Sequence, residues 1–156
     1  MRNKNRQEGF SLIELLIVVA ILGILAAIAI PNLLASRRAA NEASAISSTR
    51  TLSTAEEVYR STNGNGVTFA DLSQLAGLGM VDGNLAAATT IATAKSGYIF
   101  SITVPAGSLS FCAGAAPATS ISGTRNFSSD EPHLIYAHPL DVANPPTSTA
   151  GGSPLD

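Results

Sequence analysis

The chain has 156 residues, of which 46% are hydrophobic, and a formal net charge of −2 at pH 7. This length suits one modest domain. Residues 1–8 contain three basic residues and one acidic residue, whereas the rest of the chain contains six basic and ten acidic ones. This mildly acidic remainder argues against nucleic-acid binding through bulk positive charge. The single cysteine, Cys112, excludes a disulfide within the chain.

A long apolar segment follows the basic start. Residues 10–30 include one charged side chain, Glu14. About 20 apolar residues span a bilayer as a helix, and a carboxylate inside such a segment costs roughly 2.5–3.5 kcal/mol on insertion scales. The basic residues before it predict a cytoplasmic N-terminus by the positive-inside rule. The sequence therefore predicts a transmembrane helix with one charge that needs a reason to be there.

Two residues soften this helix. Gly23 weakens a helix interior by about 1 kcal/mol relative to alanine. Pro31 has no N–H to donate to the carbonyl of Ala27, and its ring crowds that turn. We expect at least a proline kink here, which a membrane helix tolerates.

The next segment, residues 32–62, is predicted to continue the helix in amphipathic form. One face is predicted to carry Ala39, Ala43, Ile46, Leu52, Ala55 and Tyr59. Largely elsewhere lie Arg38, Glu42, Ser48, Glu56 and Arg60. The run Asn63-Gly64-Asn65-Gly66 then ends the helix, and residues 63–96 form a connecting region with a short helix near residues 69–75.

The C-terminal part of the chain has the pattern of a small sheet. Strand signals occur at residues 97–104, 109–115, 124–128 and 133–138, with turn residues between them that favour an antiparallel meander. The tail, residues 139–156, accumulates Pro, Gly, Ser and Thr and is predicted to be irregular. Residues 63–138 alone are few for an independent core. The predicted fold is therefore α+β, with a long helix over residues 10–62 packed on an antiparallel sheet of three to four strands within residues 97–138.

The N-terminal residues carry a family resemblance. The run GFSLIELLIVVAILGILAAIAIPNLLASRRAANEA resembles the N-terminus of type IV pilins and of the pseudopilins of type II secretion systems. The matching elements are a short basic leader ending in Gly9, Phe10 as the new first residue, Glu14 four residues later, then Gly23 and Pro31. The close match covers roughly residues 1–60, and beyond it only the general layout is similar.

The resemblance implies roles for these residues. A prepilin peptidase would cut between Gly9 and Phe10, and the new amine of Phe10 would be N-methylated. Glu14 would pair with the N-terminal amine of an adjacent subunit, which satisfies a charge that lipid solvates poorly. The helix between Gly23 and Pro31 would lose helical structure inside a filament.

The function implied is that of a filament subunit rather than an enzyme. The chain would wait in the inner membrane as a single-pass precursor. An assembly platform and its ATPase would then add it to an extracellular or periplasmic homopolymer serving adhesion, motility, DNA uptake or secretion. We expect no cofactor and no specific nucleic-acid or small-molecule site. Two alternatives stay open: a pseudopilin of a type II secretion system, and a soluble secreted binding domain released by signal peptidase after Ala27-Ile28-Ala29.

Other polar residues give weaker signals. His133 and His138 lack further ligands at metal-site spacing, so we expect no metal there. The acids Asp71, Asp82, Asp130 and Glu131 could offer oxygens to calcium, as in the resembling major pseudopilins, but they show no calcium-loop spacing and are expected to be solvated.

The lone cysteine and the basic pair have structural interpretations. Cys112 lies in an apolar run and is expected to be a buried small side chain. Many pilins close a C-terminal loop with a cysteine pair, so in this chain packing or neighbouring subunits must hold that region. Arg37 and Arg38 directly follow the apolar run and are expected to anchor it at the membrane surface or to lie on the helix surface.

Overall fold

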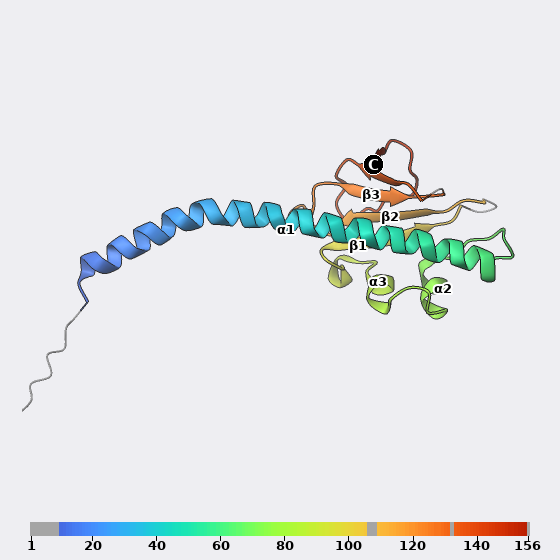
Figure 1. The fold of residues 1–156 in the computed structure, drawn as a ribbon, viewed down its shortest axis with the longest axis horizontal. Coiled ribbons are helices and arrows are strands. Elements are labelled where there is room, and N and C mark those ends of the chain that lie inside the picture. Colours follow the sequence, from blue (N-terminus) through green and yellow to red (C-terminus); the bar gives the residue numbers. More distant parts are fainter. Residues whose placement is uncertain (1–9, 106–108, 132, 156) are drawn as a thin grey trace, which may run out of the picture. The chain divides into compact units, whose positions relative to one another are not determined.

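The computed structural model describes residues 10–105, 109–131 and 133–155 (Figure 1). The chain divides into two compact units, Met1–Ser36 and Arg37–Asp156. One helix, α1 (Leu12–Thr62), contributes its first 25 residues to the first unit and the remainder to the second. The predicted long helix is thus confirmed.

In the first unit, the described residues are almost entirely helix. Gly23 and Pro31 both lie inside α1, which is continuous through them. The large apolar side chains of this unit are exposed. The helix is long and apolar enough to cross a membrane, judged by length and composition.

The second unit combines the end of α1 with three short helical elements and a sheet. The helical elements are α2 (Leu72–Gly77), α3 (Gly83–Ala87) and the 3₁₀ helix η1 (Ile91–Thr93). The strands are β1 (Tyr98–Thr103), β2 (Cys112–Pro117), β3 (Asn126–Ser129), β4 (Ile135–His138) and β5 (Ser153–Leu155). Asp71 caps α2 by accepting a hydrogen bond from the amide of Gln74.

The sheet is an antiparallel meander in the order β1-β2-β3-β4-β5, as the turn signals predict. The pairing of β1 with β2 extends from Tyr98 opposite Pro117 to Thr103 opposite Cys112. The described residues form five strands, one more than the upper end of the expected three to four. The extra strand, β5, lies in the tail that was expected to be irregular and pairs with β4 alone. Its three residues include Pro154 and have no apolar alternation, so the sequence carried no strand signal there.

The core lies between the second half of α1 and one face of the sheet. Leu52 of α1 belongs to one buried cluster with Tyr98, Phe100 and Phe127 of the sheet. In Figure 1 the green part of α1 crosses β1 and β2, consistent with this packing.

The apolar face predicted for α1 coincides only in part with the residues that are buried in this subunit. Ala39 and Ala43 are exposed, whereas Glu42, Ser48 and Glu56 are buried. The complete buried set is Glu42, Ala45, Ser48, Thr49, Leu52, Ser53, Ala55 and Glu56. Small hydroxyl side chains can be buried there because they bond to the helix itself. For example, Ser53 donates to the carbonyl of Thr49 at 3.1 Å.

Candidate assembly surfaces of the long helix

The first turn of α1 is organised around Glu14. The backbone N–H of Ser11 donates a hydrogen bond to Oε2 of Glu14 at 2.9 Å. The carboxylate therefore satisfies one of the unpaired amides at the helix N-terminus and lies at the end of the helix dipole that favours negative charge. Phe10, just before the helix, is 83% exposed. Gly9 lies outside the described residues.

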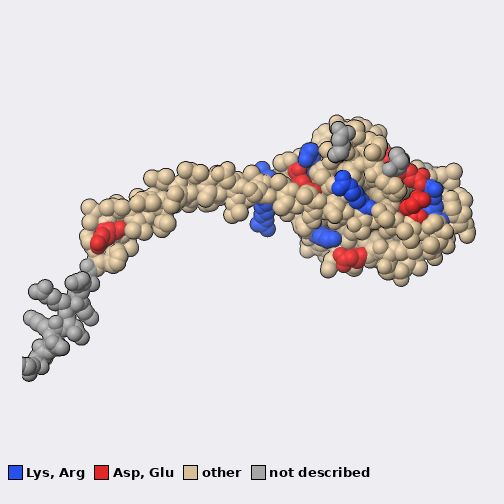
Figure 2. Space-filling view, viewed as in Figure 1, with Lys and Arg blue, Asp and Glu red and all other residues tan. Residues whose placement is uncertain are grey.

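The rest of the first unit offers an uncharged surface. Glu14 is the only charged residue between positions 10 and 36. Figure 2 shows a continuous tan surface between the acidic start of the helix and the basic side chains further along it. Exposed apolar surface of this extent marks a contact with membrane or protein. At Gly23, a Cβ would meet nothing within 4 Å, so in the described subunit no internal contact requires glycine.

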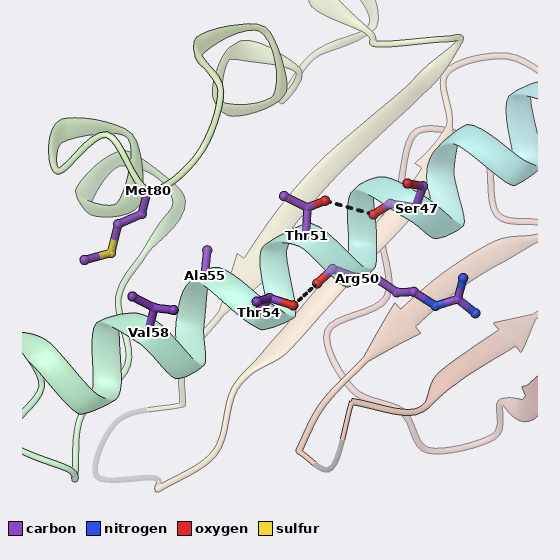
Figure 3. Close-up of a pocket in the computed structure, with 7 residues that line it drawn as sticks. All are labelled: Ser47, Arg50, Thr51, Thr54, Ala55, Val58 and Met80. Carbon is purple, nitrogen blue, oxygen red and sulfur yellow. Dashed lines mark hydrogen bonds between the residues drawn. The ribbon is translucent and has the colours of Figure 1, made fainter.

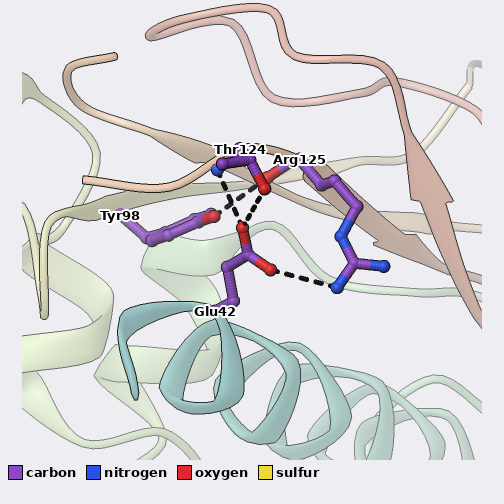
Figure 4. Close-up of polar contacts among 4 residues, drawn as sticks. All are labelled: Glu42, Tyr98, Thr124 and Arg125. Carbon is purple, nitrogen blue, oxygen red and sulfur yellow. Dashed lines mark hydrogen bonds and ion pairs between the residues drawn. The ribbon is translucent and has the colours of Figure 1, made fainter. Parts of the chain in front are cut away.

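In the second unit, α1 is fixed to the sheet by Glu42 (Figure 4). Oε1 of Glu42 accepts from the amide and the hydroxyl of Thr124, at 2.8 and 2.6 Å. Oε2 accepts from the Arg125 guanidinium at 3.0 Å. Burial disfavours the charged carboxylate, but these donors outweigh it and hold the pKa of Glu42 below its ordinary value.

A tyrosine completes this cluster. The hydroxyl of Tyr98 donates to the carbonyl of Arg125 at 2.9 Å. A Cβ at Gly123 would clash with the same hydroxyl, so only glycine fits at that position. The connection between β2 and β3 is thus held by α1 and by β1 together.

Another face of α1 is open and carries a shallow groove (Figure 3). Its lining residues are Ser47, Arg50, Thr51, Thr54, Ala55 and Val58 of α1, with Met80. Thr51 and Thr54 donate their hydroxyl protons to carbonyls one turn back, at 3.1 and 3.0 Å. Because these protons are already bonded, a partner that covered the groove would not strand the two threonine hydroxyls, although it would have to supply acceptors for Arg50.

The C-terminal loop is held by hydrogen bonds centred on Asn126. Its Nδ2 donates to the carbonyls of Asp141 and Asn144 at 2.9 and 3.0 Å, and its Oδ1 accepts from the amide of Asp141 at 3.1 Å. A Cβ at Gly114 would clash with the carbonyl of Pro146, so β2 and the loop are in close contact. These contacts hold the loop in a chain whose single cysteine allows no internal disulfide.

Cys112 is buried, as expected from the apolar run. Its thiol lies 3.7 Å from the carbonyl oxygen of Pro146. Burial, with a smaller contribution from Asp130, raises the pKa of the thiol to about 12. A thiol in this state is a packing group rather than a nucleophile.

The four acids considered for calcium have separate structural roles. Asp71 and Asp82 cap α2 and α3. Asp130 accepts from the hydroxyl of Thr149 at 2.8 Å, and Glu131 forms an ion pair with Arg60. Within the described part of the chain, no three His, Cys, Asp or Glu side chains converge as metal ligands would.

The two histidines have different surroundings. Nε2 of His138 lies 2.6 Å from the hydroxyl oxygen of Ser128, and burial lowers the pKa of this histidine. His133 is exposed and adopts a positive φ of 70°. The structure does not bring them together as a pair of ligands.

Sequence reasoning missed Glu42, Glu56 and Asn126 as structural residues. Helical periodicity treats an acid as a solvent-facing residue, so it assigned both glutamates to the polar face. The partners of Glu42 lie about 80 positions further along the chain. No local signal could have identified them.

Comparison with known proteins supports the interpretation of the N-terminus. Residues 4–30 match the model of the prokaryotic N-terminal methylation motif. The chain thus has a prepilin-type N-terminal segment, as its resemblance indicated.

Over part of its length the chain is similar to two kinds of protein. The chain is 64% identical over 42 residues to the type IV wide pilus major component PilA4 of Thermus thermophilus, and this alignment covers 27% of this chain and 30% of the relative. It is 40% identical over 60 residues to the type II secretion system core protein G of Aeromonas hydrophila, with 38% and 42% covered. It is 48% identical over 54 residues to the type IV major pilin protein PilA of Myxococcus xanthus, with 35% and 24% covered.

These alignments span less than half the length of each relative. No solved structure matches the chain.

Proposed function

We propose that this protein is the structural subunit of a type IV pilus-like filament, polymerised through the first part of α1. The observation that carries the proposal is an exposed apolar helix with one charge, Glu14, at its start, within a prepilin-type segment. A surface of this kind needs a membrane before assembly and neighbouring subunits after it. The role is structural, with no catalytic step assigned to any residue.

Maturation begins with cleavage between Gly9 and Phe10 by a prepilin peptidase, followed by N-methylation of Phe10. Methylation preserves the positive charge of the new amine and adds apolar bulk. Glu14 then pairs with the amine of Phe10 in an adjacent subunit, replacing its bond to the Ser11 amide or sharing it. The pair neutralises two charges that lipid solvates poorly.

Assembly draws subunits from the inner membrane, where an assembly platform and an ATPase add them to the growing homopolymer. Gly23 and Pro31 soften the helix between them, so that it can lengthen as subunits pack. The groove beside Val58 and Met80 is a second surface that a neighbouring subunit can cover. The finished filament is extracellular or periplasmic, and adhesion, motility, DNA uptake and secretion are all compatible with it.

A pseudopilin of a type II secretion system is the second candidate. The observation that favours it is the similarity to core protein G over 60 residues. Electron microscopy of filaments sheared from cells separates the two. Long extracellular fibres whose subunit has the mass of residues 10–156 support the pilus, whereas absence of this chain from the sheared fibres, with the processed chain retained in the cell envelope, supports the pseudopilus.

The remaining alternative is a soluble domain released by signal peptidase after Ala29. N-terminal sequencing of the mature protein separates it from both filament subunits. A start at Phe10 supports the proposal, and a start at Ile30 contradicts it.

A further inference from the structure

Glu56 is a carboxyl group cut off from water in the second half of α1. The residue is 0% exposed. Its Oε2 accepts one hydrogen bond, from the amide of Ala70 at 3.0 Å. Its Oε1 is buried and has no hydrogen-bond partner among the described residues. A buried carboxylate requires a paired cation or several donors, and Glu56 has a single donor.

The charged groups around Glu56 do not compensate for it. Asp71, next to Ala70 at the start of α2, adds a second negative charge. Arg60, one turn further along α1, is occupied by ion pairs with Glu131 and with Glu57. Among the described residues no ion pair reaches Glu56. Burial first and Asp71 second raise its pKa to about 7, although the hydrogen bond from Ala70 opposes them.

We propose that Glu56 acts as a proton-operated latch, which holds residues 63–71 against α1 when it is neutral and releases them when it is ionised. Ala70 lies at the end of this segment, and its amide is the group that the carboxyl holds. Ionisation favours movement of the segment away from α1, because such movement breaks the contact at Ala70 and opens a path from the carboxylate to water. Acidic surroundings therefore keep the segment closed, and neutral or alkaline surroundings favour its opening.

Release of the segment would change the surface of the second unit. Phe69 is buried, its ring centroid lies 4.9 Å from that of Phe111, and the guanidinium of Arg60 lies 5.7 Å from the same ring. Opening would separate these contacts and expose an aromatic side chain. The latch thus couples ambient pH to the apolar surface beside the end of α1. It does not depend on the proposed filament function.

Hydrogen–deuterium exchange of the full chain in detergent micelles between pH 4.5 and 8.5 tests the latch. Peptides that cover residues 67–77 report the opening, after correction for the intrinsic exchange rate at each pH. In the wild type, the opening constant should rise by roughly tenfold per pH unit up to about pH 7 and stay level above it, because the open state loses its proton more readily.

Two variants make the test specific. Glu56→Gln keeps the shape of the side chain but cannot ionise, so opening should be independent of pH over this range. Glu57→Gln is the matched control, since Glu57 is the adjacent, partly exposed glutamate of the same helix and its contact with Arg60 is long, at 3.8 Å. It should follow the wild-type profile.

The proposal is overturned if opening in the wild type does not change with pH, or if Glu56→Gln keeps the wild-type profile. Should Glu56→Gln fail to fold, Asp71→Asn provides an independent readout, because asparagine still caps a helix. Loss of the neighbouring negative charge should lower the pKa of Glu56 in the closed state, so the midpoint, meaning the pH at which the opening constant stops rising, should move to lower pH. A midpoint that does not move contradicts the latch.

Discussion

Oε1 of Glu42 lies 2.8 Å from the amide nitrogen and 2.6 Å from the hydroxyl oxygen of Thr124, 82 positions apart in the chain. One carboxylate on the long helix thus fixes the turn that leads into β3. The same contact explains how a sheet of short strands stays attached to a helix whose facing side chains are mostly small.

Replacement of Glu42 by alanine should destabilise the second unit. The change leaves Thr124 and Arg125 without their acceptor, and hydrogen bonds to a charged group contribute about 1.5–3 kcal/mol. We expect the free energy of unfolding to fall by about 2–3 kcal/mol, measured by denaturant titration of the full chain in micelles.

The matched control is Glu57→Ala, which removes only a long surface ion pair to Arg60. Its effect should be about 0–0.5 kcal/mol. Equal losses in the two variants would show that the Glu42 contacts do not support the fold.

Acid should lower the free energy of unfolding by protonating Glu42. The pKa of Glu42 in the folded state lies below its ordinary value of 4.5. The unfolded chain therefore binds a proton first, and the stability that Glu42 contributes is complete above about pH 4.5 and is lost as pH falls through the folded pKa.

Comparison of the wild type with Glu42→Gln between pH 6 and pH 3 measures this contribution, as a difference in Tm. The difference should be largest near pH 6 and shrink towards pH 3. The pKa values of Asp71 and Asp82 are also lowered, but both proteins retain these acids, so their effect cancels. A difference that is constant across this range would contradict the assignment.

Much of the fold could be predicted from the sequence, because its main signals are local. The long helix was predicted from the apolar run and the Asn-Gly residues that end it. The antiparallel meander was predicted from the strand signals and the turn residues between them. The buried face of α1 could not be predicted in this way. Glu42 and Glu56 are buried by partners that lie elsewhere in the chain, and Ala39 and Ala43 are exposed in the isolated subunit although their composition suits packing.

Among the candidate functional and structural residues, too, those with a local sequence signal could be predicted and those with distant partners could not. Glu14 stands out because a charge interrupts an apolar run, and its contact with Ser11 is three residues away in sequence. Asn126 could not be identified, since its partners are the carbonyls of a loop without periodicity. Strand β5 escaped prediction for a related reason, because its register is set by β4 rather than by its own three residues.

Asn126→Ala should loosen the C-terminal loop. Asn126 is 1% exposed and makes three hydrogen bonds to this loop, to Asp141 and Asn144. At about 1 kcal/mol for each bond, the loss should be about 3 kcal/mol. Cleavage by proteinase K between residues 139 and 152 should become faster than in the wild type.

Asn144→Ala is the control, because its exposed side chain makes one hydrogen bond, to Asp141. Its cleavage rate should stay close to that of the wild type. If Asn126→Ala is as resistant as the wild type, the loop is held by something other than this network.

Glu14→Ala should be processed and inserted but should assemble poorly. A charge-assisted hydrogen bond contributes about 1.5–3 kcal/mol, so its loss at each subunit contact should reduce the yield of sheared filaments by roughly tenfold or more. Glu14→Asp keeps the charge and should restore part of the yield. A normal yield from Glu14→Ala would remove the carboxylate from the assembly mechanism.

The most direct test of the filament account is the intact mass of the chain in sheared surface filaments, compared between the wild type and Gly9→Val. We predict a wild-type subunit that begins at a methylated Phe10. Gly9→Val should give no filaments and should accumulate in the membrane as a precursor heavier by about 1 kDa, the mass of the retained leader. A mature chain that begins at Phe10 in Gly9→Val, or a wild-type product that begins at Ile30 in the soluble fraction, would contradict the account.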